Sequence, residues 1–195
     1  MIFQPNEEED GNTRVPYRAT AAGSGWESIR PLPACVLLEN VRSLYNVGAF
    51  FRTADAVALE KLYLTGITGH PPERMITKTA LGAEETVAWQ HSAETEKTLL
   101  ELRSANYEIA AIETSAHAID LFDWHPRFPV CVLFGHETDG LTRRAAGLAD
   151  THIRIPMLGR KHSLNVASAG AVVLYELLRK YKAYFVTPAV LPPVP

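Results

Sequence analysis

The sequence predicts an α/β fold in which helices cover both faces of a mainly parallel sheet. Short, continuously apolar segments alternate along the chain with longer segments whose apolar residues recur at helical spacing. Strands that are buried on both faces are apolar throughout, and helices connect parallel strands. The length of 195 residues, with 47% hydrophobic and 21% charged residues, fits one globular domain with short tails.

Five apolar segments are expected to be strands, and three amphipathic segments are expected to be helices. The expected strands are residues 34–39, 61–65, 108–113, 129–134 and 151–155. The expected helices are residues 46–57, 93–104 and 166–184. The last helix carries an apolar stripe and ends in basic residues, which favour the negative end of a helix dipole.

Polar or proline-rich segments flank this domain. Residues 1–32 are polar and contain repeated Gly, Pro and Ser, so they are expected to form a flexible arm. The α/β domain is expected to occupy residues 33–184. Residues 185–195 contain four prolines, which cannot continue a helix, and form a proline-rich tail.

Several classes of protein are disfavoured by composition. No apolar segment approaches the roughly 20 residues that a membrane-spanning helix needs, and no secretory signal is visible, so a cytoplasmic protein is expected. The histidines and cysteines lack the spacing of metal ligands, so no metal site is expected. Cys35 and Cys131 lie in apolar segments and are expected to be buried free thiols.

The charge distribution leaves two interpretations open. The net charge of −3 argues against a strongly basic nucleic-acid-binding protein. Residues 141–182, however, contain eight Lys or Arg residues and only two Asp or Glu residues. These cations either hold a polyanion or are solvated charges on helix ends and loops.

Three segments after expected strands combine Gly or Pro with polar residues, which a protein core would not favour. They are residues 40–52 (NVRSLYNVGAFFR), 133–141 (LFGHETDGL) and 155–165 (IPMLGRKHSLN). Glycine allows a backbone to approach a ligand closely, and ligands of parallel sheets bind beyond the carboxyl ends of the strands. The three segments therefore predict one shared pocket.

Individual residues in these segments have both structural and functional interpretations. Ser163 or Asn165 either caps the last helix or binds a ligand at the helix start. Glu137 accepts hydrogen bonds from a ligand, holds a neighbouring loop, or is a solvated carboxylate in a turn. Arg52, in an apolar segment, either forms a salt bridge with Glu137 or Glu39 or binds a nucleic-acid phosphate.

The order and spacing of these motifs carry a resemblance to a known family. The patterns N-x5-N-x-G-x3-R from Asn40, F-G-x-E-x2-G-L from Phe134 and I-P-M-x-G-x3-S-L-N from Ile155 resemble the three motifs of the SpoU (TrmH-type) branch of the SPOUT RNA methyltransferases. Residues 78–85 (KTALGAEE) resemble a further signature of this family. The resemblance covers residues 34–182. Leu44 and Tyr45 stand where the family commonly has Asp-Pro.

The resemblance implies a homodimeric enzyme that methylates a ribose 2′-hydroxyl of tRNA or rRNA with S-adenosylmethionine and no metal. It also implies a deep trefoil knot in the C-terminal part, which general topology rules would not predict. Carried over by motif, the residues that bind the methyl donor are Phe134, Gly135, Ile155, Met157, Ser163 and Leu164. The implied catalytic residues are Arg52, Asn46, Glu137, Ser163 and Asn165, with Arg52 near the donor site of the partner subunit.

The role of the arginine and the nature of the activity leave alternatives. Arg52 is either the base, or it holds a phosphate and stabilises the developing alkoxide, since a guanidinium keeps its proton in proteins. A non-catalytic RNA-binding protein with the same fold is the alternative function. A nicotinamide-binding enzyme would need a G-x-G-x-x-G turn after the first strand, and residues 40–52 contain only Gly48.

Overall fold

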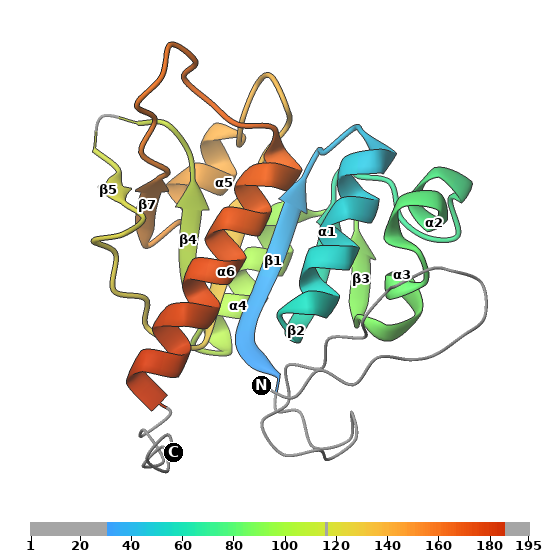
Figure 1. The fold of residues 1–195 in the computed structure, drawn as a ribbon, viewed down its shortest axis with the longest axis horizontal. Coiled ribbons are helices and arrows are strands. Elements are labelled where there is room, and N and C mark those ends of the chain that lie inside the picture. Colours follow the sequence, from blue (N-terminus) through green and yellow to red (C-terminus); the bar gives the residue numbers. More distant parts are fainter. Residues whose placement is uncertain (1–30, 116, 186–195) are drawn as a thin grey trace, which may run out of the picture. The chain divides into compact units, whose positions relative to one another are not determined.

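The computed structural model describes residues 31–115 and 117–185, and the side chains up to residue 182 (Figure 1). The expected arm, apart from its last two residues, lies outside the described residues, as does the expected tail from residue 186 onward. The first strand begins at Leu32, two residues before the expected start.

The described chain forms a seven-stranded sheet in which every pair of neighbouring strands is parallel. The strand order is β3-β2-β1-β6-β4-β7-β5. The strands are β1 (Leu32–Glu39), β2 (Leu59–Thr65), β3 (Trp89–Ser92), β4 (Glu108–Ile112), β5 (Ile119–Asp120), β6 (Val130–Phe134) and β7 (Thr151–Arg154). The predicted parallel α/β fold is confirmed, and β1 and β6, its neighbouring central strands, are almost wholly buried.

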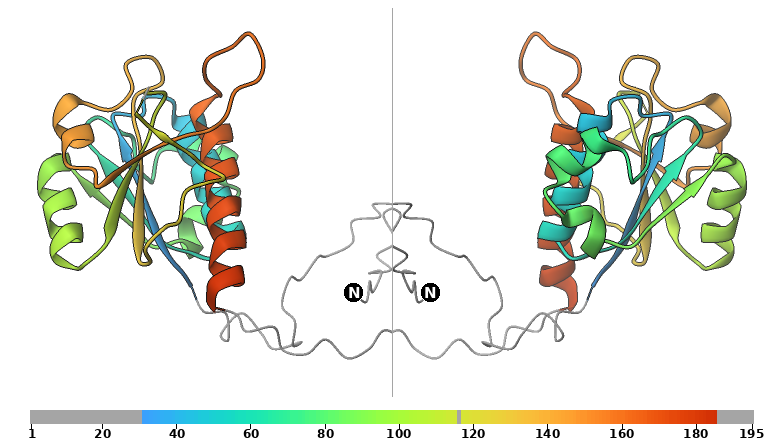
Figure 2. Two further views of the ribbon diagram at one scale, coloured as in Figure 1. Left: turned by 90° about the vertical axis from the view of Figure 1, so that its left-hand side faces the viewer. Right: turned by 90° about the vertical axis from the view of Figure 1, so that its right-hand side faces the viewer.

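Helices cover both faces of this sheet (Figure 2). They are α1 (Leu44–Ala56), α2 (Arg74–Ala80), α3 (Ala83–Thr86), α4 (Thr95–Ser104), α5 (Arg143–Gly147) and α6 (Val166–Phe185). The core on one face joins α1, α2, α3 and α6 to the sheet, with Phe50 and Phe51 among its largest buried side chains. The core on the other face joins α4 and α5 to the same strands through Leu99, Leu102 and Ala145.

The eight expected elements lie within a few residues of their expected positions, and five further elements were not expected. Those without a prediction are β3, β5, α2, α3 and α5, of two to seven residues each, too short to show a clear period. Helix α1 starts two residues before its expected start because Ser43 is its N-cap. The Ser43 hydroxyl accepts a hydrogen bond from the backbone N–H of Asn46 at 3.3 Å.

Two glycines bring helices together rather than admitting a ligand. A Cβ on Gly48 of α1 would lie 1.9 Å from the Thr79 hydroxyl of α2. A Cβ on Gly170 of α6 would lie 2.2 Å from the ring of Phe50 on α1. Both positions therefore need glycine so that α1 can pack closely against α2 and α6.

The two cysteines are buried free thiols, as expected. Cys35 on β1 and Cys131 on β6 are partners in the parallel register. Burial, together with the neighbouring Cys131, raises the pKa of the Cys35 thiol well above its ordinary value. The pair therefore acts as two small apolar residues at the centre of the sheet.

A buried lysine joins α6 to the segment between β5 and β6. Lys180 is 4% exposed, and its ammonium donates to the carbonyl oxygens of Leu121 at 2.7 Å, Phe122 at 3.3 Å and Trp124. Glu176, one turn earlier on α6, lies 3.5 Å from the same ammonium. Burial lowers the pKa of Lys180, and the attraction of Glu176 opposes this effect. The ammonium thus satisfies three carbonyl groups of a segment outside the strands.

Replacing Lys180 by Met should destabilise the protein by about 2 kcal/mol or more, because buried carbonyl groups would lose their donor. The measurement is the free energy of unfolding in urea. Lys182→Met, an exposed change on the same helix, is the matched control and should stay within about 0.5 kcal/mol of wild type. Equal effects of the two substitutions would contradict the anchoring role of Lys180.

Candidate active site

The three motif segments all leave the same edge of the sheet (Figure 1). Strands β1, β6 and β7 run parallel, so residues 40–43, 135–142 and 155–165 all follow carboxyl ends. Such an edge is where parallel sheets bind their ligands. Side chains from all three segments meet there through hydrogen bonds.

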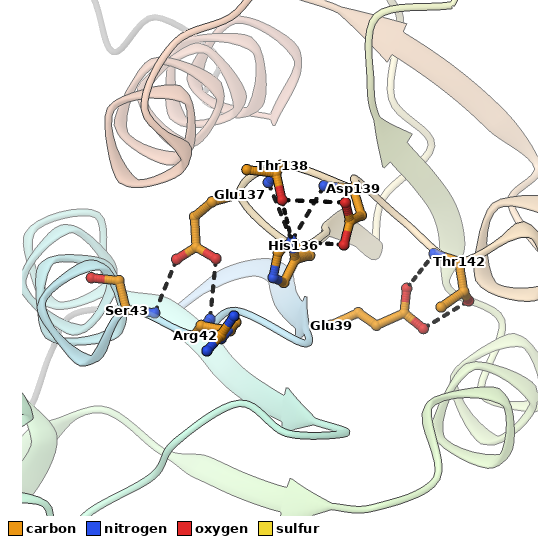
Figure 3. A network of polar contacts seen from close by, with 8 residues as sticks. All are labelled: Glu39, Arg42, Ser43, His136, Glu137, Thr138, Asp139 and Thr142. Atoms are coloured by element: carbon orange, nitrogen blue, oxygen red, sulfur yellow. Dashed lines mark hydrogen bonds and ion pairs between the residues drawn. The ribbon is translucent and has the colours of Figure 1, made fainter.

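Glu137 holds the loop after β1 (Figure 3). One carboxylate oxygen accepts hydrogen bonds from the Ser43 N–H and the Asn46 side-chain amide, both at 3.0 Å. The other oxygen accepts from the Arg42 N–H at 3.1 Å. Partial burial raises the pKa of Glu137, but the N–H donors outweigh it and lower the pKa below its ordinary value. Of the interpretations of Glu137, the structure favours a residue that positions a neighbouring loop.

A second carboxylate makes the opposite connection. Glu39, at the end of β1, is 3% exposed and accepts hydrogen bonds from the Thr142 N–H at 2.8 Å and the Thr142 hydroxyl at 2.9 Å. Thr142 in turn caps α5. We call Glu39 and Glu137 the carboxylate clasp, because each reaches from its own strand end to the loop of the other strand. In the sequence, Glu39 is a charged residue that ends an apolar strand, and this pattern alone does not predict a role in the site.

Asn165 joins the third motif to this arrangement. Its side-chain N–H donates to the side-chain oxygen of Asn46 at 3.2 Å. Its side-chain oxygen accepts from the N–H groups of Ala167 at 3.0 Å and Ser168 at 3.3 Å, so Asn165 is the cap of α6. Asn165, Asn46 and Glu137 therefore form a chain of hydrogen bonds that links all three motifs. Ser163 is exposed and has no hydrogen bond to a described residue.

The loop after β6 closes on itself. The backbones of His136 and Gly140 exchange two hydrogen bonds of 3.0 Å, and the His136 ring accepts the N–H groups of Thr138 and Asp139 at 3.2 Å. A Cβ on Gly135 would lie 2.2 Å from the Gly140 carbonyl carbon. The group that approaches Gly135 closely is therefore the backbone of Gly140 in the same loop.

The segment before α6 is the open part of the site. In Figure 2 it rises beyond the N-terminal end of α6. Among the described residues, none hydrogen-bonds to the backbone N–H or C=O groups of residues 156–164. Ile155 and Met157 are half-buried, Leu164 is 41% exposed, and Phe134, at the end of β6, is buried. Within the described part of the chain, this segment therefore presents unpaired backbone groups beside apolar side chains.

Arg52 lies apart from this network. It is six residues after Asn46 on α1, which places it about 9 Å further along the axis and about a third of a turn away. Its side chain is exposed and makes no hydrogen bond or ion pair with a described residue. The interpretation of Arg52 as a salt-bridge partner of Glu137 or Glu39 is wrong, because backbone and side-chain donors of the loops occupy both carboxylates.

The basic segment 141–182 is not one patch. Arg144 pairs with Glu96 and Arg154 with Asp120. Arg179 pairs with Glu176, and Lys180 is buried. Half of the eight cations are therefore engaged within the fold, so the eight do not form a single surface for a polyanion.

The part of the chain that the structure describes offers neither a metal site nor a membrane span. There, no three His, Cys, Asp or Glu side chains gather in an arrangement that could hold a metal ion. The helices of that part include none long and apolar enough to cross a membrane.

Glu137→Gln should lower stability in a pH-dependent way. Because the pKa of Glu137 is lower in the folded chain than its ordinary value of 4.5, its carboxylate stabilises the fold above that pH. The difference in unfolding free energy between wild type and variant should be full at neutral pH and should shrink as the pH falls below 4.5. Urea titrations at several pH values measure it.

Glu101→Gln, an exposed change on α4, is the control for removing a negative charge. It should leave the pH dependence of stability close to that of wild type. A wild-type advantage over Glu137→Gln that stayed constant through the acidic range would show that the charge of Glu137 does not hold the loop.

Known proteins share both the sequence pattern and the fold. The model of the family described as the SpoU rRNA Methylase family matches residues 33–175. The tRNA (guanosine(18)-2'-O)-methyltransferase of Escherichia coli K12 is 35% identical over 147 residues, which are 74% of this chain and 62% of the relative. The enzyme of the same name from Thermus thermophilus is 34% identical over 145 residues, 74% of each chain. The chain thus spans about three fifths of the length of the Escherichia coli relative.

Solved structures of similar enzymes share the fold of this chain. The TrmH/SpoU tRNA modifying enzyme of A. aeolicus superposes with a TM-score of 0.72 at 27% identity, covering 79% of this chain and 78% of that one. The AdoMet-bound rRNA methyltransferase of Sinorhizobium meliloti superposes with a TM-score of 0.71 at 30% identity, covering 77% of this chain and 60% of that one.

Proposed function

The chain belongs to the SpoU methylase family, and from this premise we propose that it methylates a ribose 2′-hydroxyl of RNA with S-adenosylmethionine. The observation that carries the proposal is the hydrogen-bonded chain Asn165–Asn46–Glu137, which joins all three motifs beside an open backbone segment. The relatives' names include tRNA and rRNA methyltransferases, so the proposed substrate is tRNA or rRNA.

The methyl donor would bind at the carboxyl ends of β6 and β7 and to the loops that follow them. Bound there, S-adenosylmethionine supplies an electrophilic methyl group. The unpaired backbone groups of residues 156–164 would bind its polar atoms, and Phe134, Ile155, Met157 and Leu164 would border its apolar parts. The Gly135 backbone and the Ser163 hydroxyl complete the proposed set. The proposal includes the deep trefoil knot of the family, which would form in the C-terminal part of the chain.

Asn46, Glu137 and Asn165 act mainly by positioning in this proposal. Glu137 fixes the two backbone N–H groups before α1 and orients the Asn46 amide, which in turn orients Asn165. Because in-line methyl transfer depends on placing the reacting atoms, loop order of this kind raises the rate. Ser163 is the side chain left available to a substrate or donor group.

Arg52 would act on the substrate. A guanidinium keeps its proton in proteins and offers several donors in a plane. We therefore assign Arg52 to hold the phosphate beside the target ribose and to stabilise the alkoxide as it develops, while phosphate or water takes the hydroxyl proton. The separation of Arg52 from the network of its own chain supports a role at the donor site of a partner subunit.

The role assigned to Arg52 at a partner's donor site implies a homodimer. Exposed apolar side chains on α6 support the same proposal. Val172 is 39% exposed and Tyr175 is 52% exposed on this helix. Helix α1, which carries Arg52, packs beside α6 through Gly170 and Phe50. A second copy of the chain placed on this face would cover the apolar side chains and lie close to Arg52. A cytoplasmic location, where RNA substrates are present, completes the proposal.

The purified protein should bind S-adenosylmethionine with about micromolar affinity, near 8 kcal/mol, and transfer labelled methyl groups to RNA. The experiment offers unfractionated tRNA and ribosomal RNA in parallel and maps the 2′-O-methyl groups formed. Loss of a mapped site from cells without this protein would identify the substrate. RNA binding without transfer to either RNA would support the non-catalytic alternative.

Arg52→Ala should slow methyl transfer by about 100-fold or more, the scale of losing one charge-stabilising donor. Donor affinity should barely change, because the donor is assigned to the other two loops. Arg52→Lys should restore only part of the rate, since an ammonium lacks the planar donor pair. Single-turnover rates and calorimetric donor affinities provide the comparison, and a rate within a few-fold of wild type would remove Arg52 from the mechanism.

The protein should be a dimer whose interface buries at least about 1,600 Å² in total. Tyr175→Glu should produce a monomer, because an exposed apolar side chain of the proposed interface would become charged. Light scattering gives the mass of each. Leu100→Glu, also at an exposed apolar position but on α4, should remain a dimer. A monomeric wild type would refute the proposal.

A further inference from the structure

Helix α2 carries two cations that the fold does not use. Arg74 and Lys78 are four residues apart, so both lie on one face of the helix, and both are exposed. Neither makes an ion pair or a side-chain hydrogen bond with a described residue, although Glu73 precedes Arg74 in the sequence. Like charges at this spacing destabilise a helix, so the arrangement costs stability unless an anion binds.

The position of α2 is fixed by tight packing. The Gly48–Thr79 contact allows α2 to lie directly against α1 (Figure 1). The Tyr45 hydroxyl of α1 lies 3.8 Å from the Met75 sulfur of α2. These contacts place Arg74 and Lys78 on a rigid surface, with Lys78 next in sequence to the residue that touches Gly48.

The loop before α2 is tied to the candidate active site. The Ile67 N–H donates to the Asn40 side chain at 3.1 Å, and the Val41 N–H donates to the Thr68 hydroxyl at 3.0 Å. Rings order the same loop, since His70 stacks on Trp89 with centroids 5.9 Å apart. Helix α2 and the loop before it therefore adjoin the helix that carries Arg52 and the loop that Glu137 holds.

Several cations elsewhere are engaged within the fold and fit a polyanion less well. Arg144, Arg154 and Arg179 are paired with acids, and the groove of about 880 Å³ beside α4 is lined by four glutamates against one Lys and one Arg. Exposed and unpaired cations beside the site are what the phosphates of a nucleic acid require.

We propose that Arg74 and Lys78, the α2 basic surface, bind backbone phosphates of the RNA strand that flanks the target nucleotide. The proposal rests on the function proposed above and assigns the surface by which the RNA is held. The contacts are to phosphate, so they add affinity and register without sequence preference.

The test compares the double variant Arg74→Ala/Lys78→Ala with wild type in filter binding of labelled unfractionated tRNA and of a ribosomal RNA transcript, over a range of salt. Each lost phosphate contact should reduce the slope of log affinity against log salt by about 0.7. The double variant should therefore lose about 1.4 of slope and roughly 25-fold in affinity near 0.1 M salt. Alanine favours helices, so α2 should stay folded.

The matched control is Lys97→Ala/Arg143→Ala, which removes two exposed cations from α4 and α5 on the opposite face of the sheet. It should keep the wild-type slope and affinity. Equal losses of affinity in the two double variants would show that only the net charge matters, and this would overturn the proposal. An unchanged salt slope in the α2 variant would also overturn it.

Methyl transfer separates this proposal from the function on which it rests. If wild type binds RNA but transfers no methyl group, the proposed function fails, and the slopes still decide the role of α2. If wild type transfers methyl groups, the α2 variant should show a raised KM for RNA at nearly unchanged kcat, and donor affinity should match wild type. A lower kcat at unchanged KM would overturn the proposal.

Discussion

The carboxylate clasp is the constraint on which the rest of the site depends. Strands β1 and β6 are neighbours in a parallel sheet, so their following loops leave side by side. Glu39 fixes the loop after β6, and Glu137 fixes the loop after β1. The Glu137 carboxylate also accepts a hydrogen bond from the Asn46 side chain, which in turn accepts one from Asn165. Because Asn165 caps α6, these hydrogen bonds also position the start of α6.

Residues that look like parts of a ligand-binding motif can also meet demands of the fold, and this chain shows how the two combine. Gly48 and Gly170 allow helices to touch, and Gly135 makes room for its own loop. Glu137 uses its hydrogen-bonding capacity on backbone N–H groups and the Asn46 amide. Among the described residues, those that remain open to a ligand are the ones that the fold leaves unpaired, such as Arg52, Ser163 and the backbone before α6.

Sequence patterns predicted the elements that carry a long apolar period and failed on those that do not. Strands β1 and β6 and helices α1 and α6 were predictable because burial on one or two faces dictates their residues. The two-residue β5 is defined by its pairing with β7, which no local pattern contains. Within the site, the alternatives for Glu137 and Arg52 could not be decided from sequence, because they depend on which loops lie side by side. The contact of Glu39 with Thr142 depends on the same arrangement of loops.

The order of the strands has a consequence for how the chain acquires its site during synthesis. Strands β1, β2 and β3 form one side of the sheet from the first half of the domain, whereas β6 and Thr142 come about a hundred residues after Glu39. The ribosome releases the chain from its N-terminus onward, and a domain generally folds as a unit. A nascent chain that has emerged only as far as β3 therefore holds Glu39 without a partner. The site becomes ordered late in translation, so incomplete chains carry none of the joined motifs.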